Sequence, residues 1–324
     1  MVTARKFRFG VAVTSEITSA KACVELARKA EDLGYSTVLV SDHMSRSSAP
    51  LVISMAILSA TTTLRVGTQV LANPFRNPAI LAKEIASLDL LSDGRFEPGI
   101  GAGWPSTSRT GRSDSDQTGI EMGGSGERVE RLEDAVRIIK RFLSSDGPFD
   151  FEGKHFSVKG LVPFPRAVQR PHPPIMIAGA GPRLMRFAAK EANIINIAPR
   201  PPIVGPTVAG SMGFGMTMAD EVALIKEAAG DRYDDIELCV FSYNPGSSNP
   251  SITDRAEELI EHLAGELNTT PEAVDGMPAA LIGSEAALVE RIASHRELYD
   301  ITYRTIPDSA LEAFAPIVAR LAGT

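Results

Sequence analysis

Short apolar runs alternate with longer amphipathic segments along almost the whole chain, and this alternation constrains the fold more than any other feature. The apolar runs have the length of strands, and glycine or polar residues separate them from segments with a helical period. The segment Arg128–Leu143, for example, carries an apolar stripe at helical spacing. Eight strands are predicted, at 7–13, 36–41, 64–70, 96–101, 173–178, 193–198, 236–242 and 301–306.

Strands that are each followed by a helix, repeated over about 300 residues, favour a (β/α)8 TIM barrel. Most of these strands are apolar on both faces, as strands of a parallel sheet covered on both sides must be. A doubly wound sheet is the alternative, but it usually contains fewer such units. No domain boundary is visible, so we expect residues 1–324 to form a single domain. The long segments 104–127, 146–172 and 199–217 are interpreted as insertions on the barrel.

Composition narrows the class of protein. The net charge of −7 disfavours a surface for nucleic acid or for an anionic membrane. No apolar run is long enough for a membrane-spanning helix, and the first residues lack a signal-peptide core, which favours a cytoplasmic protein. Cys23 and Cys239 lie in apolar segments and are interpreted as reduced core residues. The histidines are scattered along the sequence, so no metal site is predicted.

Gly99, Gly101 and Gly103, in the stretch FEPGIGAGWPSTSRTG (96–111), raise the question of a dinucleotide-binding turn. Such a turn needs a helix directly after the glycines, because the pyrophosphate rests on the N-terminus of that helix. A long polar stretch without helical periodicity follows here, so this interpretation fails. Two interpretations are left: the glycines let a flat ligand lie against the end of the fourth strand, or they form an ordinary tight turn.

Four blocks of sequence resemble the bacterial luciferase-like superfamily, and within it the flavin- and deazaflavin-dependent oxidoreductases, many of which use coenzyme F-420. The blocks are VSDH, then VGTQVLANPFRNPAILAKEIASLDLLSDGRFEPGIGAGW from Val66 to Trp104, then RVERLEDAVRIIK and PPIMIAGAGPR. The resemblance continues over nearly the whole chain, in order, and ends with YRTI and LEAFAPIVARLAG. It implies a (β/α)8 barrel with long insertions, which agrees with the fold predicted from the strand count.

Asp42 and His43 follow the second predicted strand, at the carboxyl-terminal rim where barrel enzymes place their chemistry. The resemblance implies that Asp42 contributes to cofactor binding. It also implies that His43 is catalytic and lies by the flavin or deazaflavin ring, where it positions substrate or moves a proton. Histidine suits that role because its ordinary pKa is near working pH. The alternative is a surface-loop histidine bonded to its neighbour.

Thr68, Gln69 and Val70 end the third predicted strand. Family members carry a bulge here and often a non-proline cis peptide bond, and the matching bond in this chain is Gln69–Val70. The resemblance implies that this bend supports one face of the ring; an ordinary pair of buried strand residues is the alternative. Gly103 and Trp104, after the fourth strand, are interpreted as part of the wall of the ring pocket.

The loop AGAGPR at 178–183 connects the fifth strand to its helix. Gly179, Ala180 and Gly181 offer backbone N–H groups at a helix N-terminus, and Arg183 adds positive charge, which together make an anion site. The resemblance implies that this loop binds the cofactor phosphate. A glycine-rich strand–helix connection without a ligand is the alternative.

The sequence departs from the family after Trp104. Some relatives carry an acidic residue just after the glycines of the fourth strand, or an aromatic–acidic pair slightly later. A Ser-, Arg- and Asp-rich stretch follows here, and Asp116 is the nearest match to the later acid. We expect 104–127 to be a mobile lid or a disordered loop, because its polar composition offers little surface to bury.

Together with these features, the resemblance implies an oxidoreductase that transfers hydride between C5 of coenzyme F-420 and a small organic substrate. The alternative is a two-component monooxygenase that uses FMNH2 and O2 and receives reduced cofactor from a separate reductase. A non-catalytic barrel is a third interpretation, and retention of Asp42, His43, 68–70 and 178–183 together argues against it. The resemblance further implies a homo-oligomer, a dimer or higher. The variable insertions would set the substrate, so the sequence does not identify it.

Overall fold

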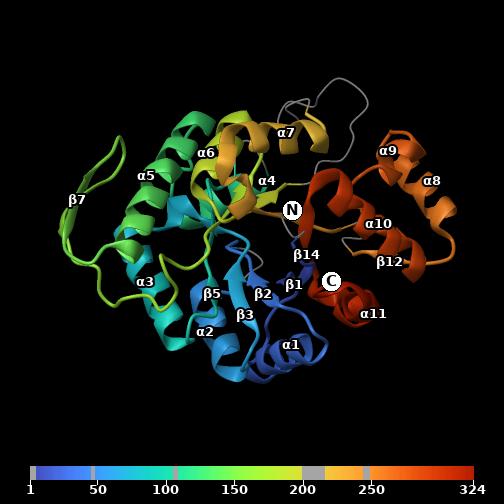
Figure 1. Cartoon of the computed structure of the whole chain (residues 1–324), viewed down its shortest axis with the longest axis horizontal. Helices are drawn as coiled ribbons and strands as arrows, with labels where there is room; N and C mark the ends of the chain where they lie inside the picture. The colour runs from blue at the N-terminus through green and yellow to red at the C-terminus, as the bar shows by residue number, and fades with distance from the viewer. Residues whose placement is uncertain (1–4, 45–47, 105–108, 199–215, 244–248) are drawn as a thin grey trace.

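All eight predicted strands form in the computed structural model, and they pair in parallel around a ring (Figure 1). The structure describes residues 5–44, 48–104, 109–198, 216–243 and 249–324. The strands of the main sheet are β1 (Arg8–Val13), β2 (Thr37–Val40), β3 (Arg65–Thr68), β4 (Leu71–Ala72), β5 (Phe96–Glu97), β6 (Gly99–Gly101), β9 (Met176–Gly179), β10 (Ile194–Ile197), β11 (Glu237–Phe241) and β14 (Ile301–Pro307).

The ring closes because two of its strands are each divided into two short segments. Only Gln69 and Val70 separate β3 from β4, and only Pro98 separates β5 from β6. The first segments pair with each other, β3 with β5, and so do the second segments, β4 with β6. β3 also pairs with β2, and β6 with β9, so the ten segments of the sheet make eight parallel strands. The remaining pairs complete the circle, and the predicted (β/α)8 barrel is confirmed.

Helices cover the outside of the ring, and they alternate with the strands as predicted (Figure 1). Side-chain caps define where several of them begin: Ser19, Asn77, Thr217 and Ser284 each accept hydrogen bonds from first-turn N–H groups. The outer helices are α1 (Ala20–Asp32), α2 (Pro50–Ala60), α3 (Pro78–Leu91), α5 (Ser125–Ser144), α6 (Pro182–Glu191), α7 (Met218–Ala229), α10 (Glu285–Tyr299) and α11 (Leu311–Leu321). Within the described ranges, no helix combines the length and the apolarity that crossing a membrane requires.

Several smaller elements decorate the barrel. Within the 146–172 insertion, β7 and β8 form an antiparallel hairpin that projects at the left of Figure 1, while a separate group at the right contains α8, α9 and the parallel pair β12 and β13. Their bounds, with those of the short 3-10 turns, are β7 (Phe149–Glu152), β8 (Ser157–Leu161), β12 (Ser251–Ile252), β13 (Ile282–Gly283), α8 (Ala256–Glu266), α9 (Pro271–Asp275), η1 (Asn73–Phe75), η2 (Gly230–Asp235) and η3 (Asp308–Ala310). That residues 1–324 form a single domain stays a prediction.

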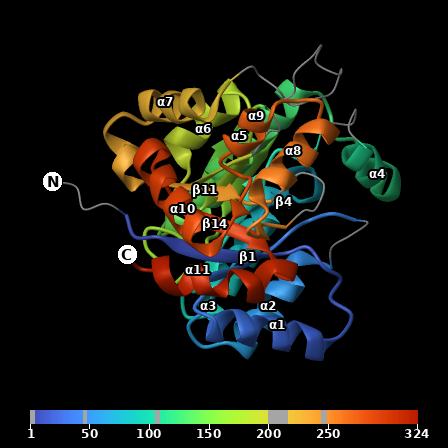
Figure 2. The same ribbon diagram turned by 90° about the vertical axis from the view of Figure 1, so that its right-hand side faces the viewer.

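The insertion at 104–127 contains a helix that the sequence did not predict. Helix α4 (Arg109–Thr118) stands out from the barrel on the side opposite the chain ends (Figure 2). Its sequence is polar throughout, and Asp114 is the buried residue in its second half. The expectation of a segment without helical structure was therefore wrong, because this helix faces the barrel with a carboxylate rather than with an apolar stripe. Residues 105–108 of the insertion lie outside the described part of the chain.

The side chains inside the barrel differ in polarity along the barrel axis. At mid-height the inward side chains form an apolar layer that consists of Leu39, Met176, Ile194, Cys239 and Tyr303. A larger apolar cluster fills the space between the outer face of the sheet and the helices. Both cysteines are buried and unbonded, as predicted: Cys239 in the interior layer and Cys23 in the outer cluster.

At the amino-terminal end of the strands, a network of charged side chains fills the interior. The Arg8 guanidinium donates from Nε to both carboxylate oxygens of Glu237, at 3.0 and 2.9 Å, and from Nη1 to those of Glu97, at 2.9 and 3.1 Å. Arg65 also binds Glu97, and the Arg8 guanidinium carbon lies 3.8 Å from the centre of the Tyr303 ring. Burial alone would raise the pKa of Glu97, but the charges of Arg8 and Arg65 outweigh it and lower the pKa of this carboxyl.

Replacing Glu97 by Gln should therefore destabilise the barrel. The amide cannot neutralise the two partly buried guanidinium groups that contact the buried Glu97 carboxylate, so we expect the free energy of unfolding to fall by about 3 kcal/mol in urea titrations at neutral pH. The pKa of Glu97 is lowered in the folded state. The ionised carboxylate therefore contributes fully to stability above its ordinary pKa of 4.5, and this stabilisation is lost as pH falls below that value and through the lowered pKa of the folded state. The difference between wild type and variant should shrink in acid.

The matched control is Asp146→Asn, which removes an ion pair with Arg166 at a side chain that is 91% exposed. Solvent screens such a pair, so we expect no measurable change in stability. If the Glu97 and Asp146 variants unfolded at the same urea concentration, the charged network would contribute nothing to the stability of the barrel.

Candidate active site at the carboxyl-terminal rim

The carboxyl ends of parallel barrel strands meet at one rim, and most of the predicted site residues are collected there. Asp42 and His43 follow β2, the Gln69–Val70 bend lies between β3 and β4, and Trp104 follows β6. Gly179 ends β9 on the same rim. The insertion predicted at 199–217 falls almost entirely on residues 199–215, which lie outside the described part of the chain.

His43 and Trp104 come together although 61 positions separate them in sequence. Their ring centres are 5.8 Å apart and their planes are inclined by 38°. The His43 side chain is 19% exposed, and Trp104 is 37% exposed. This pair therefore presents an imidazole and an indole face at the rim, as expected for a group that moves protons beside the wall of a ring pocket.

Asp42 has a different environment from its neighbour. Its carboxylate is buried and accepts a hydrogen bond from the Ala72 N–H at 2.9 Å, and it forms an ion pair with the Arg76 guanidinium. These contacts join the end of β2 to β4 and to the turn that follows it. The structure thus gives Asp42 a local structural task, and its predicted role in cofactor binding stays a prediction.

The peptide bond between Gln69 and Val70 is cis, as the resemblance implied. Thr68, just before it, is fully buried, and its hydroxyl donates to the Gly99 carbonyl and accepts from the Gly99 N–H, both at 2.8 Å. A Cβ at Gly99 would lie 1.9 Å from the Thr68 carbonyl oxygen, and one at Gly101 would lie 2.7 Å from the Val70 side chain. These glycines are therefore required by the neighbouring bent strand, which the sequence interpretation did not consider.

Two buried acceptors near the rim have no hydrogen-bond partner among the described residues. Gln69 donates from Nε2 to the Thr305 hydroxyl at 3.0 Å, but its Oε1 is unpaired. Asn196, 6% exposed, also has an unpaired Oδ1, and strand alternation places it on the inward face with Ile194. Buried acceptors without partners are costly, so both atoms fit a site whose ligand offers N–H or O–H donors. Asn196 is not among the site residues predicted from the sequence, although a single polar residue inside the apolar run NIINIA is a signal that could have identified it.

The 178–183 loop leads into α6 as predicted, with Gly181 at the N-cap at a positive φ of 98° and Pro182 as the first helical residue. Arg183, however, is directed at α5. Its guanidinium lies 3.1 Å from the Glu133 carboxylate and 3.4 Å from that of Glu130. The positive charge of Arg183 is thus shared with two glutamates, and binding of a phosphate by Gly179, Ala180, Gly181 and Arg183 stays a prediction.

Asp114 is the acidic residue of the 104–127 insertion that reaches the rim. Its Oδ2 lies 3.3 Å from His43 Nδ1, its Oδ1 accepts from the Met44 N–H at 3.1 Å, and its side chain is 2% exposed. Asp116, the acid suggested by the sequence, is exposed on the same helix. The two residues are so close in sequence that only the three-dimensional path of the insertion distinguishes them. In the described ranges, no group of three His, Cys, Asp or Glu side chains could hold a metal ion.

Comparison with known proteins identifies related sequences. The profile of a family described as luciferase-like monooxygenase matches residues 2–204. A protein of Amycolatopsis mediterranei named F-420-dependent glucose-6-phosphate dehydrogenase is 29% identical over 194 residues, which cover 57% of this chain and 56% of that protein. A protein of the same name from Kribbella flavida is 27% identical over 335 residues, 95% of this chain and 88% of the relative. The matched segment thus spans about half the length of the first relative.

Solved structures share the fold over nearly the whole chain. An F-420-dependent secondary alcohol dehydrogenase, solved in complex with an F-420–acetone adduct, superposes with a TM-score of 0.75 at 17% identity and covers 98% of this chain and 99% of its own. The EDTA monooxygenase of a Chelativorans species superposes with a TM-score of 0.74 at 16% identity and covers 98% and 94%. At these identities the likeness shows the fold alone.

Asp42 and His43 are adjacent, yet their contacts predict different consequences for stability. Asp42→Ala leaves the Arg76 guanidinium and the Ala72 N–H without their acceptor, so we expect the free energy of unfolding to fall by about 3 kcal/mol. His43→Ala removes one hydrogen bond at the rim and should cost about 1 kcal/mol. Urea unfolding of both variants measures the difference. Equal losses would contradict the structural task assigned to Asp42.

Proposed function

The chain belongs to the luciferase-like monooxygenase family, and we propose that it is an oxidoreductase that transfers hydride between coenzyme F-420 and a small organic substrate. The observation that carries this proposal is the composition of the rim. An imidazole and an indole lie together at the rim, and two buried acceptors near the same rim, Gln69 Oε1 and Asn196 Oδ1, lack partners among the described residues. The relatives named for F-420-dependent oxidation support the choice of cofactor.

The residues at the rim fit the bound group that this activity requires. When bound, F-420 supplies a carbon that accepts or donates a hydride. Gln69 and Asn196 would accept hydrogen bonds from polar N–H groups of the ring, and Trp104 would exclude water from one side of the pocket. His43 would take the proton of an alcohol substrate, or return it to a carbonyl, at the imidazole nitrogen that faces the mouth.

A flavin-dependent monooxygenase is the second candidate, because the family is described by that activity and the EDTA monooxygenase shares the fold. It would bind FMNH2 in the same pocket and depend on a separate reductase. The rim offers the same acceptors to either ring, so cofactor binding separates the two candidates. Single-domain organisation and a cytoplasmic location stay predictions from the sequence.

We expect the purified protein to bind F-420 more tightly than FMN, by tenfold or about 1.4 kcal/mol. Fluorescence titration with each cofactor measures both dissociation constants under one set of conditions. Tight FMN binding without a response to F-420 would overturn the first choice and favour the monooxygenase.

The same preparation should be tested for reduction of F-420 with glucose-6-phosphate and with 2-propanol as probe substrates. With whichever substrate is active, His43→Ala should lower kcat by about 10²–10⁴-fold, as loss of a positioned acid–base group does, with F-420 affinity retained. Near-normal turnover of this variant would remove His43 from the mechanism.

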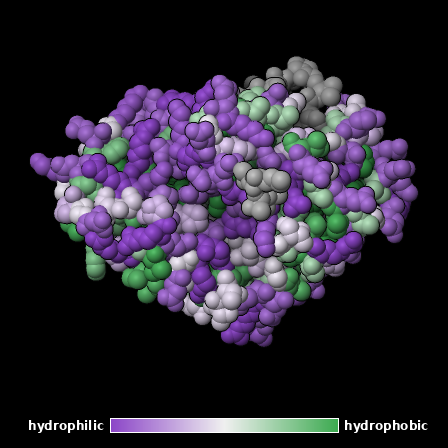
Figure 3. Space-filling view, in the orientation of Figure 1, coloured by the Kyte–Doolittle hydropathy of each residue, from purple (hydrophilic) through white to green (hydrophobic). Residues whose placement is uncertain are grey.

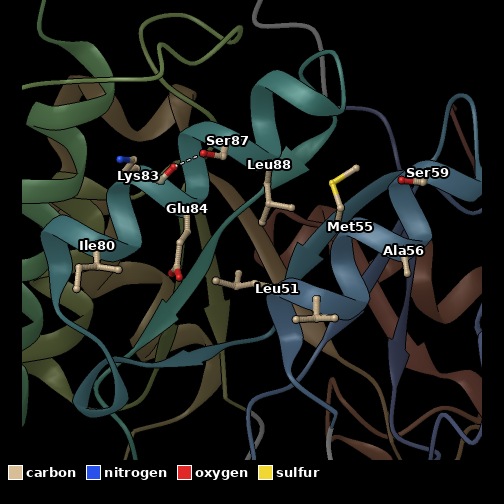
Figure 4. A pocket seen from close by; sticks show the side chains of 10 residues that line it. Leu51, Met55, Ala56, Ser59, Ile80, Lys83, Glu84, Ser87 and Leu88 are labelled. Atoms are coloured by element: carbon tan, nitrogen blue, oxygen red, sulfur yellow. Dashed lines mark hydrogen bonds between the residues drawn. The ribbon is translucent and has the colours of Figure 1, made fainter.

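We also propose that the chain forms a homodimer through helices α2 and α3. Leu51, Met55 and Leu88 approach one another across an open groove between these helices, and Ile80 and Glu84 lie at its other end (Figure 4). Val52, which also lines the groove, is 70% exposed, and Ile80 is 62% exposed. Figure 3 shows hydrophobic atoms at the lower left of a largely hydrophilic surface, where α3 lies. Both helices thus carry apolar side chains on the face turned away from the barrel as well as on the face packed against it.

The charges at this groove favour a second copy of the chain as its partner. In a two-fold interface the same surface faces itself, so residue i contacts residue j and j contacts i. Lys83 and Glu84 are adjacent exposed residues of opposite charge on α3, and no ion pair engages either of them within the described part of the chain. A two-fold axis near α3 would bring Lys83 of each copy opposite Glu84 of the other.

Val52→Lys should convert the dimer to a monomer, because it places an unpaired charge in the centre of an apolar contact. The matched control is Leu298→Lys, which changes an exposed apolar residue on α10. Sedimentation velocity measures the mass of the wild type and of both variants. A monomeric wild type, or a dimer that survives Val52→Lys, would contradict this interface.

A further inference from the structure

We infer that Asp114 positions His43 and determines which imidazole nitrogen faces the substrate. Its two carboxylate oxygens have separate partners: Oδ2 meets His43 Nδ1 at 3.3 Å and Oδ1 accepts from the Met44 N–H at 3.1 Å. The consequence for catalysis rests on the proposed function, whereas the arrangement of protons does not depend on it.

Because Asp114 is buried, these two contacts determine which nitrogen of His43 carries the proton. The side chain is 2% exposed, so water cannot readily replace a lost partner, whereas the rest of the described second half of α4 is polar and at least partly exposed. An ionised carboxylate can only accept hydrogen bonds. Neutral His43 must therefore carry its proton on Nδ1, which leaves the lone pair of Nε2 available to take a substrate proton.

The other described groups next to His43 do not bind its Nδ1. Asp42, the neighbouring carboxylate, is committed to Ala72 and to the positive charge of Arg76. Trp104 contributes an aromatic ring 5.8 Å away. Among the described residues, Asp114 is thus the carboxylate that contacts the imidazole, and it reaches the rim from an insertion rather than from the barrel itself.

Replacing Asp114 by Asn tests this inference, because the backbone N–H of Met44 determines the orientation of the Asn side-chain amide. The Met44 N–H can only donate, so the amide oxygen must face Met44 and the amide NH2 must face His43. Nδ1 would then have to accept, and the proton of neutral His43 would move to Nε2. In serine proteases the equivalent change gives the wrong tautomer and lowers kcat by about 10⁴-fold.

The readout is the tautomer of His43 in the chain of residues 1–324, from long-range proton–nitrogen NMR spectra of its five histidines. Loss of a signal in His43→Gln identifies the residue. We expect the Nδ1–H form in the wild type and in the control Asp116→Asn, and the Nε2–H form in Asp114→Asn. With an active substrate, Asp114→Asn should lower kcat by about 10²–10⁴-fold without changing the dissociation constant of F-420.

The wild-type spectrum decides the question even if Asp114→Asn fails to fold. An Nε2–H form in the wild type, or the same change of tautomer in Asp114→Asn and Asp116→Asn, would overturn the inference. A protein that shows the expected tautomers but neither binds F-420 nor reduces it would refute the proposed function and support the positioning of His43 by Asp114.

Discussion

Closure of the barrel depends on the close contact between the bent strand β3–β4 and the glycine-containing strand β5–β6. The Thr68 carbonyl oxygen occupies the space that a Cβ at Gly99 would need, and the Val70 side chain fills the space beside Gly101. Any larger residue at these positions would push the two strands apart where the ring must join. The same contact turns Gln69 inward to meet Thr305, so the geometry that completes the fold also shapes the mouth of the candidate site.

Much of this arrangement could be predicted because it depends on periodicity and chain order. Strand and helix order follow from apolar patterns, and parallel strands bring their carboxyl ends together, which is why His43 and Trp104 meet. Contacts that depend on the path of an insertion could not be predicted. Helix α4 has no apolar stripe, so nothing in its sequence distinguishes the buried Asp114 from the exposed Asp116.

For a related reason, the contact partners of long or charged side chains could not be predicted from the sequence, whereas the local backbone effects of glycine and proline could. The glycines and the proline at 179–182 shape the start of α6 as expected, because their effect is local. The partner of Arg183 depends instead on how α5 packs beside α6, and two glutamates of α5 contact its guanidinium. Asp42 likewise binds Arg76, a residue whose distance from it in the fold cannot be read from sequence spacing.

The charged network at the amino-terminal end of the barrel affects the order in which ligands can bind and leave at the carboxyl-terminal rim. Ion pairs between Arg8, Glu97 and Glu237 occupy the base of the barrel, and the apolar layer above them occupies its middle, so described side chains separate the two ends of the barrel interior. Two ligands bound together at the rim would therefore have to enter and leave from the same end of the barrel. The ligand that lies deeper must arrive first and depart last, which imposes a compulsory sequence on the steady-state kinetics of any two-substrate reaction here.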